Sequence, residues 1–174
     1  PTVLIGQFSD VIESRSLLCL TDQGLSMSFS PRSDNVIRIV NTVRQDKKKF
    51  TYPNIKFRRE DRWANAVKAV LYELAKENIK IGGYNILISG RGAGADSWSL
   101  TSSLYIGTLY GISKLENLNL SKEKILELSK KANSFSPSNQ ARLRDLWILI
   151  NARLGKIYLW SEKKEEGEEI VYEG

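Results

Sequence analysis

The first third of the chain alternates short apolar segments with polar turns, which is typical of β-strands in an antiparallel sheet. The predicted strands cover residues 3–5, 17–20, 25–29 and 36–43, and the turns between them cover residues 21–24, 31–34 and 46–49. A returning strand is expected either at residues 50–52 or at 55–57, with Pro53 placing it at a sheet edge or a bulge. We therefore predict that this third folds as an antiparallel meander.

Apolar residues then recur at intervals of three and four, which is the spacing of one helix face. This spacing between Trp63 and Leu74 predicts a helix over about residues 61–78, with Asp61 as its amino-terminal cap. The same spacing predicts three further helices, starting at about residue 96, at residue 121 and at residue 140 (ending at 152). Ser121 is a suitable cap for the second of these.

A short apolar segment at residues 84–89 is flanked by glycines on both sides and predicts a buried central strand. The chain ends in a predicted hairpin, with strands at 157–160 and 170–172 joined by a charged turn at 162–169. Strands, one helix, a central strand, further helices and a hairpin follow each other in this order. Such an order predicts the α+β class.

The turn after the central strand carries Gly90, Gly92 and Gly94 at alternate positions. Glycines let the backbone turn tightly and leave its N–H groups open to an anion at the start of the following helix. The turn lacks the lysine of a Walker loop, and Asp96 could cap the helix itself and repel a phosphate. Arg91 either contacts a phosphate or lies in solvent, so both a phosphate site and a simple turn stay open.

Composition restricts the chemistry. The chain has 174 residues and no histidine, which excludes a Ser-His-Asp triad, a Cys-His pair and a histidine zinc site. Any acid–base chemistry must therefore come from a carboxylate, a lysine or a tyrosine. Cys19 is the single cysteine, which excludes an internal disulfide and fits a reducing compartment.

The net charge of +6 permits an anionic partner such as a nucleotide or a phosphorylated metabolite. The basic residues are dispersed and are not interleaved with aromatic residues, so we do not expect a nucleic-acid interface. No apolar run approaches the roughly 20 residues that span a bilayer. We expect a cytoplasmic protein without membrane contact.

Four features, taken in order along the chain, resemble a known family. Val-Leu-Ile-Gly-Gln-Phe-Ser-Asp at residues 3–10 is similar to its opening strand, and Trp-Ala-Asn-Ala-Val-Lys-Ala-Val at 63–70 to its Trp-x-Asn helix. Gly-Ala-Gly-Ala-Asp-Ser-Trp at 92–98 stands where the family has its phosphate loop, and Asp145 precedes Gly155 by ten residues. The chain thus resembles the amino-terminal domain of the GHMP kinases, most of all that of the galactokinases.

This resemblance implies an α+β fold with an antiparallel or mixed sheet, helices on one side and a left-handed β-α-β unit. Residues 1–174 would form one such domain, and the family's usual carboxy-terminal domain would not be present in this chain. The resemblance also implies that Asp145 orients or deprotonates a sugar hydroxyl, while Gly6 and Asp10 help to hold the sugar. ATP would bind to Gly90, Arg91, Gly92, Ala93, Gly94, Ala95, Asp96 and Ser97.

The chain also departs from the family pattern. Gln7 and Phe8 replace a Glu and a His in the sugar-binding segment. Asn133 and Trp98 stand where the family has its two Mg²⁺ ligands, so ATP is implied more firmly than Mg²⁺, and we assign no metal-binding residue. Arg144 precedes Asp145 and would either keep the carboxylate ionised or lock it in a salt bridge.

Two functions therefore remain open. The chain is either part of an ATP-dependent, galactokinase-like sugar kinase or a catalytically degenerate domain of this kind that is kept as a ligand-binding or regulatory module. The expected partners are a nucleotide, a sugar and a further domain.

Overall fold

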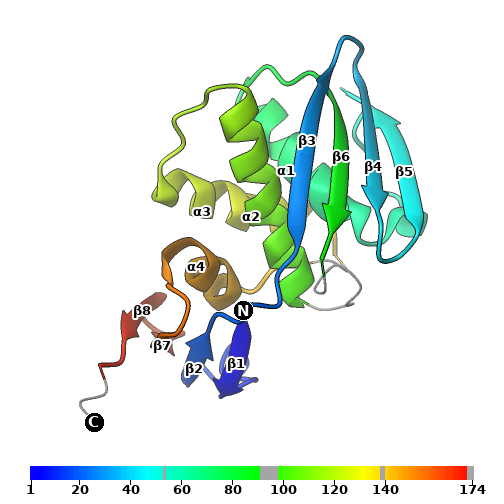
Figure 1. Cartoon of the computed structure of the whole chain (residues 1–174). Helices are drawn as coiled ribbons and strands as arrows, with labels where there is room; N and C mark the ends of the chain where they lie inside the picture. Colours follow the sequence, from blue (N-terminus) through cyan, green and yellow to red (C-terminus); the bar gives the residue numbers. More distant parts are fainter. Residues whose placement is uncertain (53, 91–97, 138–139, 172–174) are drawn as a thin grey trace.

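A computed structural model describes residues 1–52, 54–90, 98–137 and 140–171, with the backbone but not the side chain of Trp98. Its strands form two four-stranded sheets. We call them the terminal sheet, which contains strands from both ends of the chain, and the central sheet. Figure 1 shows the terminal sheet at one end of the molecule, beside one helix, while the central sheet is covered by the other helices.

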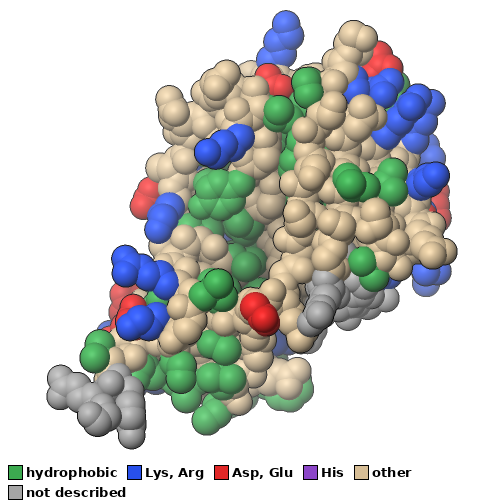
Figure 2. Space-filling model, viewed as in Figure 1, with side chains coloured by type: hydrophobic (Ala, Val, Ile, Leu, Met, Phe, Trp, Pro, Cys, Tyr) green, Lys and Arg blue, Asp and Glu red, His purple; other side chains and the backbone are tan. Residues whose placement is uncertain are grey.

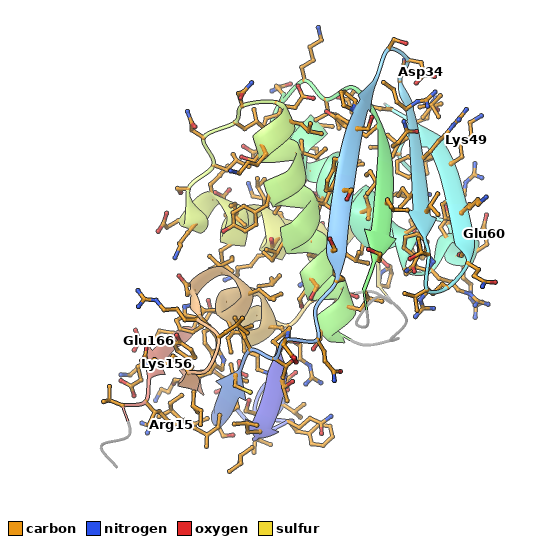
Figure 3. All side chains as sticks on the ribbon, viewed as in Figure 1. Arg15, Asp34, Lys49, Glu60, Lys156 and Glu166 are labelled. Atoms are coloured by element: carbon orange, nitrogen blue, oxygen red, sulfur yellow. The ribbon has the colours of Figure 1, made fainter. Side chains whose placement is uncertain are left out.

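The terminal sheet is antiparallel throughout. Its strands, in spatial order, are β1 (Thr2–Ile5), β2 (Arg15–Cys19), β7 (Ile157–Ser161) and β8 (Glu166–Glu169). Helix α4 (Leu143–Asn151) packs on this sheet through Ile148, which joins Leu18, Tyr158 and Trp160 in a small buried cluster. Figure 3 labels Arg15 at the start of β2, Lys156 just before β7 and Glu166 at the start of β8.

The central sheet is mixed. Its strands, in spatial order, are β3 (Ser26–Arg32), β6 (Gly83–Ser89), β4 (Val36–Asn41) and β5 (Asp46–Thr51). Strand β6 runs parallel to β4 and antiparallel to β3, and so separates two strands that are consecutive in the chain. The predicted meander is therefore wrong: β6 buries Tyr84, Ile86 and Ile88 and for that reason takes an inner position.

Three helices lie on the side of the central sheet that faces the core: α1 (Ala64–Lys76), α2 (Trp98–Leu115) and α3 (Lys122–Ala132). Their apolar faces and those of β4 and β6 form the main hydrophobic core, as the α+β prediction requires. Helix α4 contributes Leu146 and Ile150 to this core and Ile148 to the smaller cluster. It therefore lies where the two halves of the molecule meet.

The helix caps were predicted with mixed success. The Ser121 hydroxyl accepts a hydrogen bond from the Lys124 amide at 3.2 Å, so this cap is confirmed. The predicted cap Asp61 is wrong, because Trp63 occupies the cap position of α1 without a capping side chain. Asp61 belongs instead to the 3₁₀ turn η1 (Arg59–Asp61) and pairs with the buried ammonium group of Lys68.

Two predicted turns are strands. Strand β5 covers residues 46–49, and the chain reverses at 42–45, where Asn41 accepts hydrogen bonds from two backbone amides that follow it. Strand β8 lies inside the predicted turn at 162–169. Residues 170 and 171 of the expected strand are not in a strand, and residue 172 lies outside the described residues. Strand β8 is held by pairing with β7 and by Gly167, which lies against the indole ring of Trp147.

The outer face of the molecule carries dispersed charge. Figure 2 shows Lys and Arg side chains over the β4–β5 edge, where Lys47 and Lys49 are exposed. Lysines on an edge strand hinder pairing with another sheet. Among the described residues, no helix combines the length and the apolar character that membrane crossing demands.

Candidate functional site

The side chain of Arg144, in the first turn of α4, is 1% exposed. Its Nη1 donates hydrogen bonds to the Gly6 carbonyl at 3.1 Å and to the Ser9 hydroxyl at 2.6 Å. Its Nη2 donates to the Gln7 carbonyl at 2.6 Å. All three acceptors belong to the segment that follows β1, which we call the 6–10 loop. The guanidinium group thus joins the start of α4 to this loop.

Carboxylates surround the same guanidinium group. Its Nη1 lies 3.5 Å from Glu162 Oε1, at the end of β7, and 3.8 Å from Asp10 Oδ1. The Ser9 hydroxyl donates to the same Glu162 oxygen at 2.8 Å. Arg144 therefore links three segments that are far apart in the sequence, and the nearby negative charges offset the cost of burying its positive charge.

Asp10, predicted to hold a sugar, lies between two arginines. Its Oδ2 is 3.2 Å from Arg142 Nε, and its other oxygen faces Arg144. Arg142 also donates to the Gln7 carbonyl at 2.8 Å. The two arginines fix the position of the Asp10 carboxylate. Because 31% of its side-chain surface is exposed, the carboxylate also remains accessible to a ligand.

Gly6 is required by the backbone at this point. Its φ is +85°, and a Cβ atom would lie 2.5 Å from the Arg15 carbonyl oxygen of β2. The loop then closes on itself, because the Ser9 amide donates to the Gly6 carbonyl at 3.0 Å. This geometry explains the glycine by backbone strain and close approach, independently of any contact with a sugar.

Asp145, predicted as the catalytic carboxylate, is 3% exposed and follows Arg144 in α4. Burial raises its pKa above the usual range of an aspartate, against the opposing effects of Arg144, the Pro1 amino group and Arg142. Its Oδ1 has no hydrogen-bond partner among the described residues. A buried carboxylate with an unused acceptor atom is a frequent property of functional groups.

Arg144 also lies next to Asp145 in space. Arg144 Nε and Asp145 Oδ1 are 4.0 Å apart, which is beyond hydrogen-bond distance, and within the described part of the chain neither atom has a partner. The guanidinium group therefore stabilises negative charge on Asp145 from a distance. The two side chains form an ion pair at 4.0 Å without a hydrogen bond between them.

The predicted nucleotide turn is described only at its ends. Gly90 has a φ of +99°, and a Cβ atom there would lie 2.6 Å from the Gly24 carbonyl oxygen. Arg91, Gly92, Ala93, Gly94, Ala95, Asp96 and Ser97 lie outside the described residues. Beyond them, the Ser99 hydroxyl of α2 donates to the Pro1 carbonyl at 3.3 Å. The start of α2 is therefore close to the residue before β1, whereas Arg144 at the start of α4 contacts the residues that follow β1.

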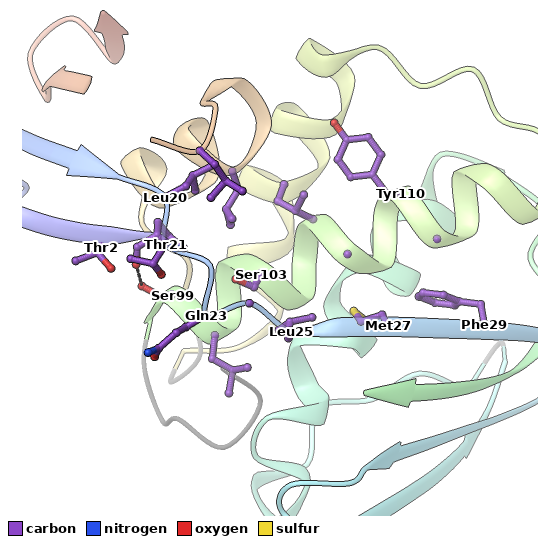
Figure 4. Close-up of a pocket in the computed structure, with 18 of the residues that line it drawn as sticks. Thr2, Leu20, Thr21, Gln23, Leu25, Met27, Phe29, Ser99, Ser103 and Tyr110 are labelled. Atoms are coloured by element: carbon purple, nitrogen blue, oxygen red, sulfur yellow. Dashed lines mark hydrogen bonds between the residues drawn. The ribbon is translucent and has the colours of Figure 1, made fainter. Parts of the chain in front are cut away.

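A groove of about 830 Å³ runs between β3 and α2 and was not predicted from the sequence. Figure 4 shows Met27 and Phe29 of β3 facing α2, with Ser99 and Ser103 nearer one end and Tyr110 further along. Gly111 of α2 permits this close approach, because a Cβ at this position would lie 2.2 Å from the Phe29 ring. Figure 2 shows the hollow on the same side of the molecule.

Asn133, predicted to stand at a metal-ligand position, has another role. Its amide nitrogen donates to the Ala141 carbonyl at 2.8 Å, and its amide oxygen accepts from the Ala141 backbone amide at 2.7 Å. Both ends of the side chain thus close the segment between α3 and α4. Within residues 1–52, 54–90, 98–137 and 140–171, no group of three or more Cys, Asp or Glu residues could hold a metal ion.

Sequence reasoning missed Ser9 and Glu162. Ser9 is buried between Arg144 and Glu162, and Glu162 was assigned to a charged turn in solvent. Their meeting depends on the pairing of β2 with β7, which joins residues about 140 positions apart in the chain. The charged pair Arg144 and Asp145, followed by the apolar residues 146–150, was the one signal of a buried polar contact.

The chain has relatives of known sequence and structure. A comparison with models of protein families finds no match. A galactokinase of Clostridium tetani is 28% identical over 132 residues, which cover 75% of this chain and 34% of that protein. The crystal structure of Lactococcus lactis galactokinase complexed with galactose superposes with a TM-score of 0.81 at 18% identity, covering 98% of this chain and 45% of that one.

A more distant structure shares the same fold. The mevalonate kinase of Methanococcus jannaschii superposes with a TM-score of 0.74 at 18% identity, covering 98% of this chain and 53% of that one. The chain therefore spans about a third to a half of the length of the three proteins compared.

Proposed function

Because this chain is related to the GHMP kinase superfamily and has the fold of a galactokinase-like amino-terminal domain, we propose that it forms the nucleotide- and sugar-binding wall of an ATP-dependent sugar kinase. In this proposal a second, carboxy-terminal domain supplies the opposite side of the cleft, since the related proteins are about twice as long as the chain. The reaction would transfer a phosphoryl group from ATP to a sugar hydroxyl.

The observation that carries the proposal is the state of Asp145. A carboxylate that is 3% exposed and leaves Oδ1 without a hydrogen-bond partner in the described part of the chain is costly to bury, and the Arg144 guanidinium 4.0 Å away offsets only part of this cost. Such a group is retained most readily where it acts on a ligand. Its raised pKa favours uptake of a proton from a hydroxyl group.

The remaining roles follow the resemblance and the geometry together. Asp145 would orient or deprotonate the sugar hydroxyl, and the 6–10 loop, with Gly6 and Asp10, would contact other hydroxyls of the sugar. The turn at residues 90–97 would bind the phosphates of ATP through backbone N–H groups. The link between Ser99 and Pro1 supports this arrangement, because it brings the helix after that turn next to the start of β1.

In this proposal no residue is assigned as a magnesium ligand, because Asn133 and Trp98 stand at the two positions where the resemblance implies one. Both amide atoms of Asn133 are used by Ala141, and the described part of the chain has no cluster of carboxylates that could replace it. No step of the proposed reaction is therefore assigned to a protein-bound metal ion. Charge on the phosphates would be offset by backbone N–H groups and by cations that ATP brings with it.

Calorimetric titration tests the proposal. We expect galactose and Mg-ATP to bind to the chain, or to any longer protein that contains it, and we expect Asp145→Asn to weaken galactose binding while leaving Mg-ATP binding unchanged. The matched control is Asp34→Asn, which removes a carboxylate at the exposed β3–β4 turn. Absence of heat with both ligands, in the chain and in the longer protein, would contradict the proposal.

A second function is favoured by one observation, the commitment of Asn133 to Ala141. On this alternative the chain is a degenerate galactokinase-like domain that binds a ligand or regulates a partner without catalysis. The triple variant Asn133→Glu, Asp96→Ser, Trp98→Ser separates the two. Mg²⁺-dependent nucleotide binding that appears only in the variant would favour the degenerate domain, and such binding in the natural chain would favour the kinase.

A further inference from the structure

The 6–10 loop has few contacts of its own that could hold it in place. Gln7 and Phe8 are exposed, and so are Val11 and Ile12, which follow directly. Among residues 6–12, Ser9 is the buried side chain. Segments with little buried apolar surface open at low free-energy cost, so this loop should be mobile unless polar contacts fix it.

Arg144 supplies such contacts from outside the loop. Its hydrogen bonds reach the backbone carbonyls of Gly6 and Gln7 and the hydroxyl of Ser9. The planar guanidinium group presents its N–H donors at fixed angles, so several acceptors bound to it are fixed relative to one another. A lysine at this position would keep the charge but not this geometry.

The surroundings of Arg144 make the contact strong and specific. Glu162 Oε1 lies 3.5 Å from Nη1 and also accepts a hydrogen bond from Ser9, so one carboxylate holds both partners. Arg144 is 1% exposed, and salt therefore screens the interaction little. Replacing Arg144 leaves the Glu162 carboxylate without this cation, and replacing Glu162 leaves the Arg144 guanidinium without this anion, which is the costly outcome for a buried ion pair.

From these contacts we propose that Arg144 is a positioning residue that fixes the 6–10 loop against the first turn of α4, so that the loop and Asp145 form one preorganised surface before any ligand binds. The guanidinium group acts through the loop and touches no ligand. That this surface receives a sugar rests on the proposed function, whereas the fixing of the loop does not.

Hydrogen exchange of the ligand-free chain tests the proposal. The reporters are the amides of Ser9, Val11 and Ser14, which are bonded within the loop region, and the reference amides are those of β6. In Arg144→Met we expect exchange at the three reporters to accelerate about tenfold or more relative to β6. Arg144→Lys should resemble Arg144→Met, because one ammonium group cannot donate to the acceptors in the loop with the fixed geometry of the planar guanidinium group.

The matched control is Arg38→Met, which removes an exposed guanidinium from β4 and should leave the loop unchanged. Equal acceleration of loop and β6 amides in Arg144→Met would overturn the proposal, because Arg144 would then support the whole fold. Full protection of the loop in Arg144→Lys would also overturn it. If Arg144→Met does not fold, Ser9→Ala and Glu162→Gln provide the same test, each with a smaller local acceleration; an unchanged loop in both contradicts the proposal.

A galactose titration by NMR then separates this inference from the proposed function. We expect Arg144→Met to weaken galactose binding about tenfold or more, since binding must now order the loop as well. If the natural chain does not bind galactose, the sugar-kinase proposal fails while the exchange result stands. If galactose binds equally well to both proteins, the loop does not need Arg144 for this role.

Discussion

The two halves of the molecule are stabilised in different ways. The central sheet and helices α1, α2 and α3 share one large apolar core, whereas the terminal sheet has a buried cluster of four residues, Leu18, Ile148, Tyr158 and Trp160. At the boundary, the terminal half is held by buried polar groups centred on Arg144. Predicted site residues Gly6, Asp10 and Asp145 lie at this boundary. Polar contacts require a fixed geometry and tolerate little change, so they hold the residues of a binding site more precisely than apolar packing does.

The largest effect should come from the apolar half. Leu104 on α2 is fully buried in the main core, so Leu104→Ala should lower the free energy of unfolding by about 2–5 kcal/mol. Leu18→Ala, in the smaller cluster, is the matched change and should have a smaller effect, because fewer apolar side chains surround it. Urea denaturation measures both. An equal or larger loss from Leu18→Ala would show that the two halves do not differ as described.

A close contact between β3 and α2 lies at the edge of the main core. In Gly111→Ala the new methyl group would meet the Phe29 ring at 2.2 Å, and we expect a loss of about 1–3 kcal/mol. Gly107→Ala is the control, because its new methyl group meets the flexible Met27 side chain, and the gain in helix propensity offsets part of the strain. Thermal unfolding of both variants should place Gly111→Ala clearly below Gly107→Ala. The reverse order would mean that Phe29 moves freely.

Asp145→Asn should have a smaller effect and the opposite sign. Because the folded pKa of Asp145 is raised, its contribution to stability is complete below the unfolded pKa and is lost as pH rises through the folded pKa. The variant should therefore be as stable as the natural chain in acid and at least as stable at neutral pH. Urea denaturation at several pH values measures the difference. A clear loss of stability at neutral pH would indicate that the ionised carboxylate supports the fold through Arg144.

The smallest effect is expected on the surface of the apolar half. Hydrogen bonds from Lys131 and Lys124 lower the pKa of Glu77 to about 2. The stabilisation from Glu77 is present above its unfolded pKa and is lost as pH falls toward the folded value, and exposed pairs of this kind contribute little. Glu77→Gln should therefore change the melting temperature slightly at neutral pH and not at all in strong salt. An effect that persists in salt would contradict this.

The sequence allowed good predictions where structure is local. The apolar spacing of α1 and the Ser121 cap of α3 depend on residues within one or two turns, and the structure agrees with both. Asp61 failed as a cap because a contact seven residues away, with Lys68, gives its carboxylate a better partner. Local patterns thus predicted the elements better than the partners of individual side chains.

The pairing of strands could not be predicted in the same way. Strand β6 inserts between β3 and β4 because its buried side chains fill the sheet interior, and no local pattern shows which neighbours it takes. The candidate site has the same limitation. Gly6, Asp10 and Asp145 were named from a resemblance, whereas Ser9 and Glu162 meet Arg144 through the pairing of β2 with β7.

The central claim is that the 6–10 loop and Asp145 form one ligand-binding surface. Addition of galactose with Mg-ATP to the ¹⁵N-labelled chain, followed by NMR, tests it most directly. We predict that the amide signals of residues 6–10 and 143–146 shift together, with the same apparent affinity, and that Asp145→Asn weakens both responses. Shifts confined to the groove around Met27 and Phe29, or no shift in either segment, would contradict the account.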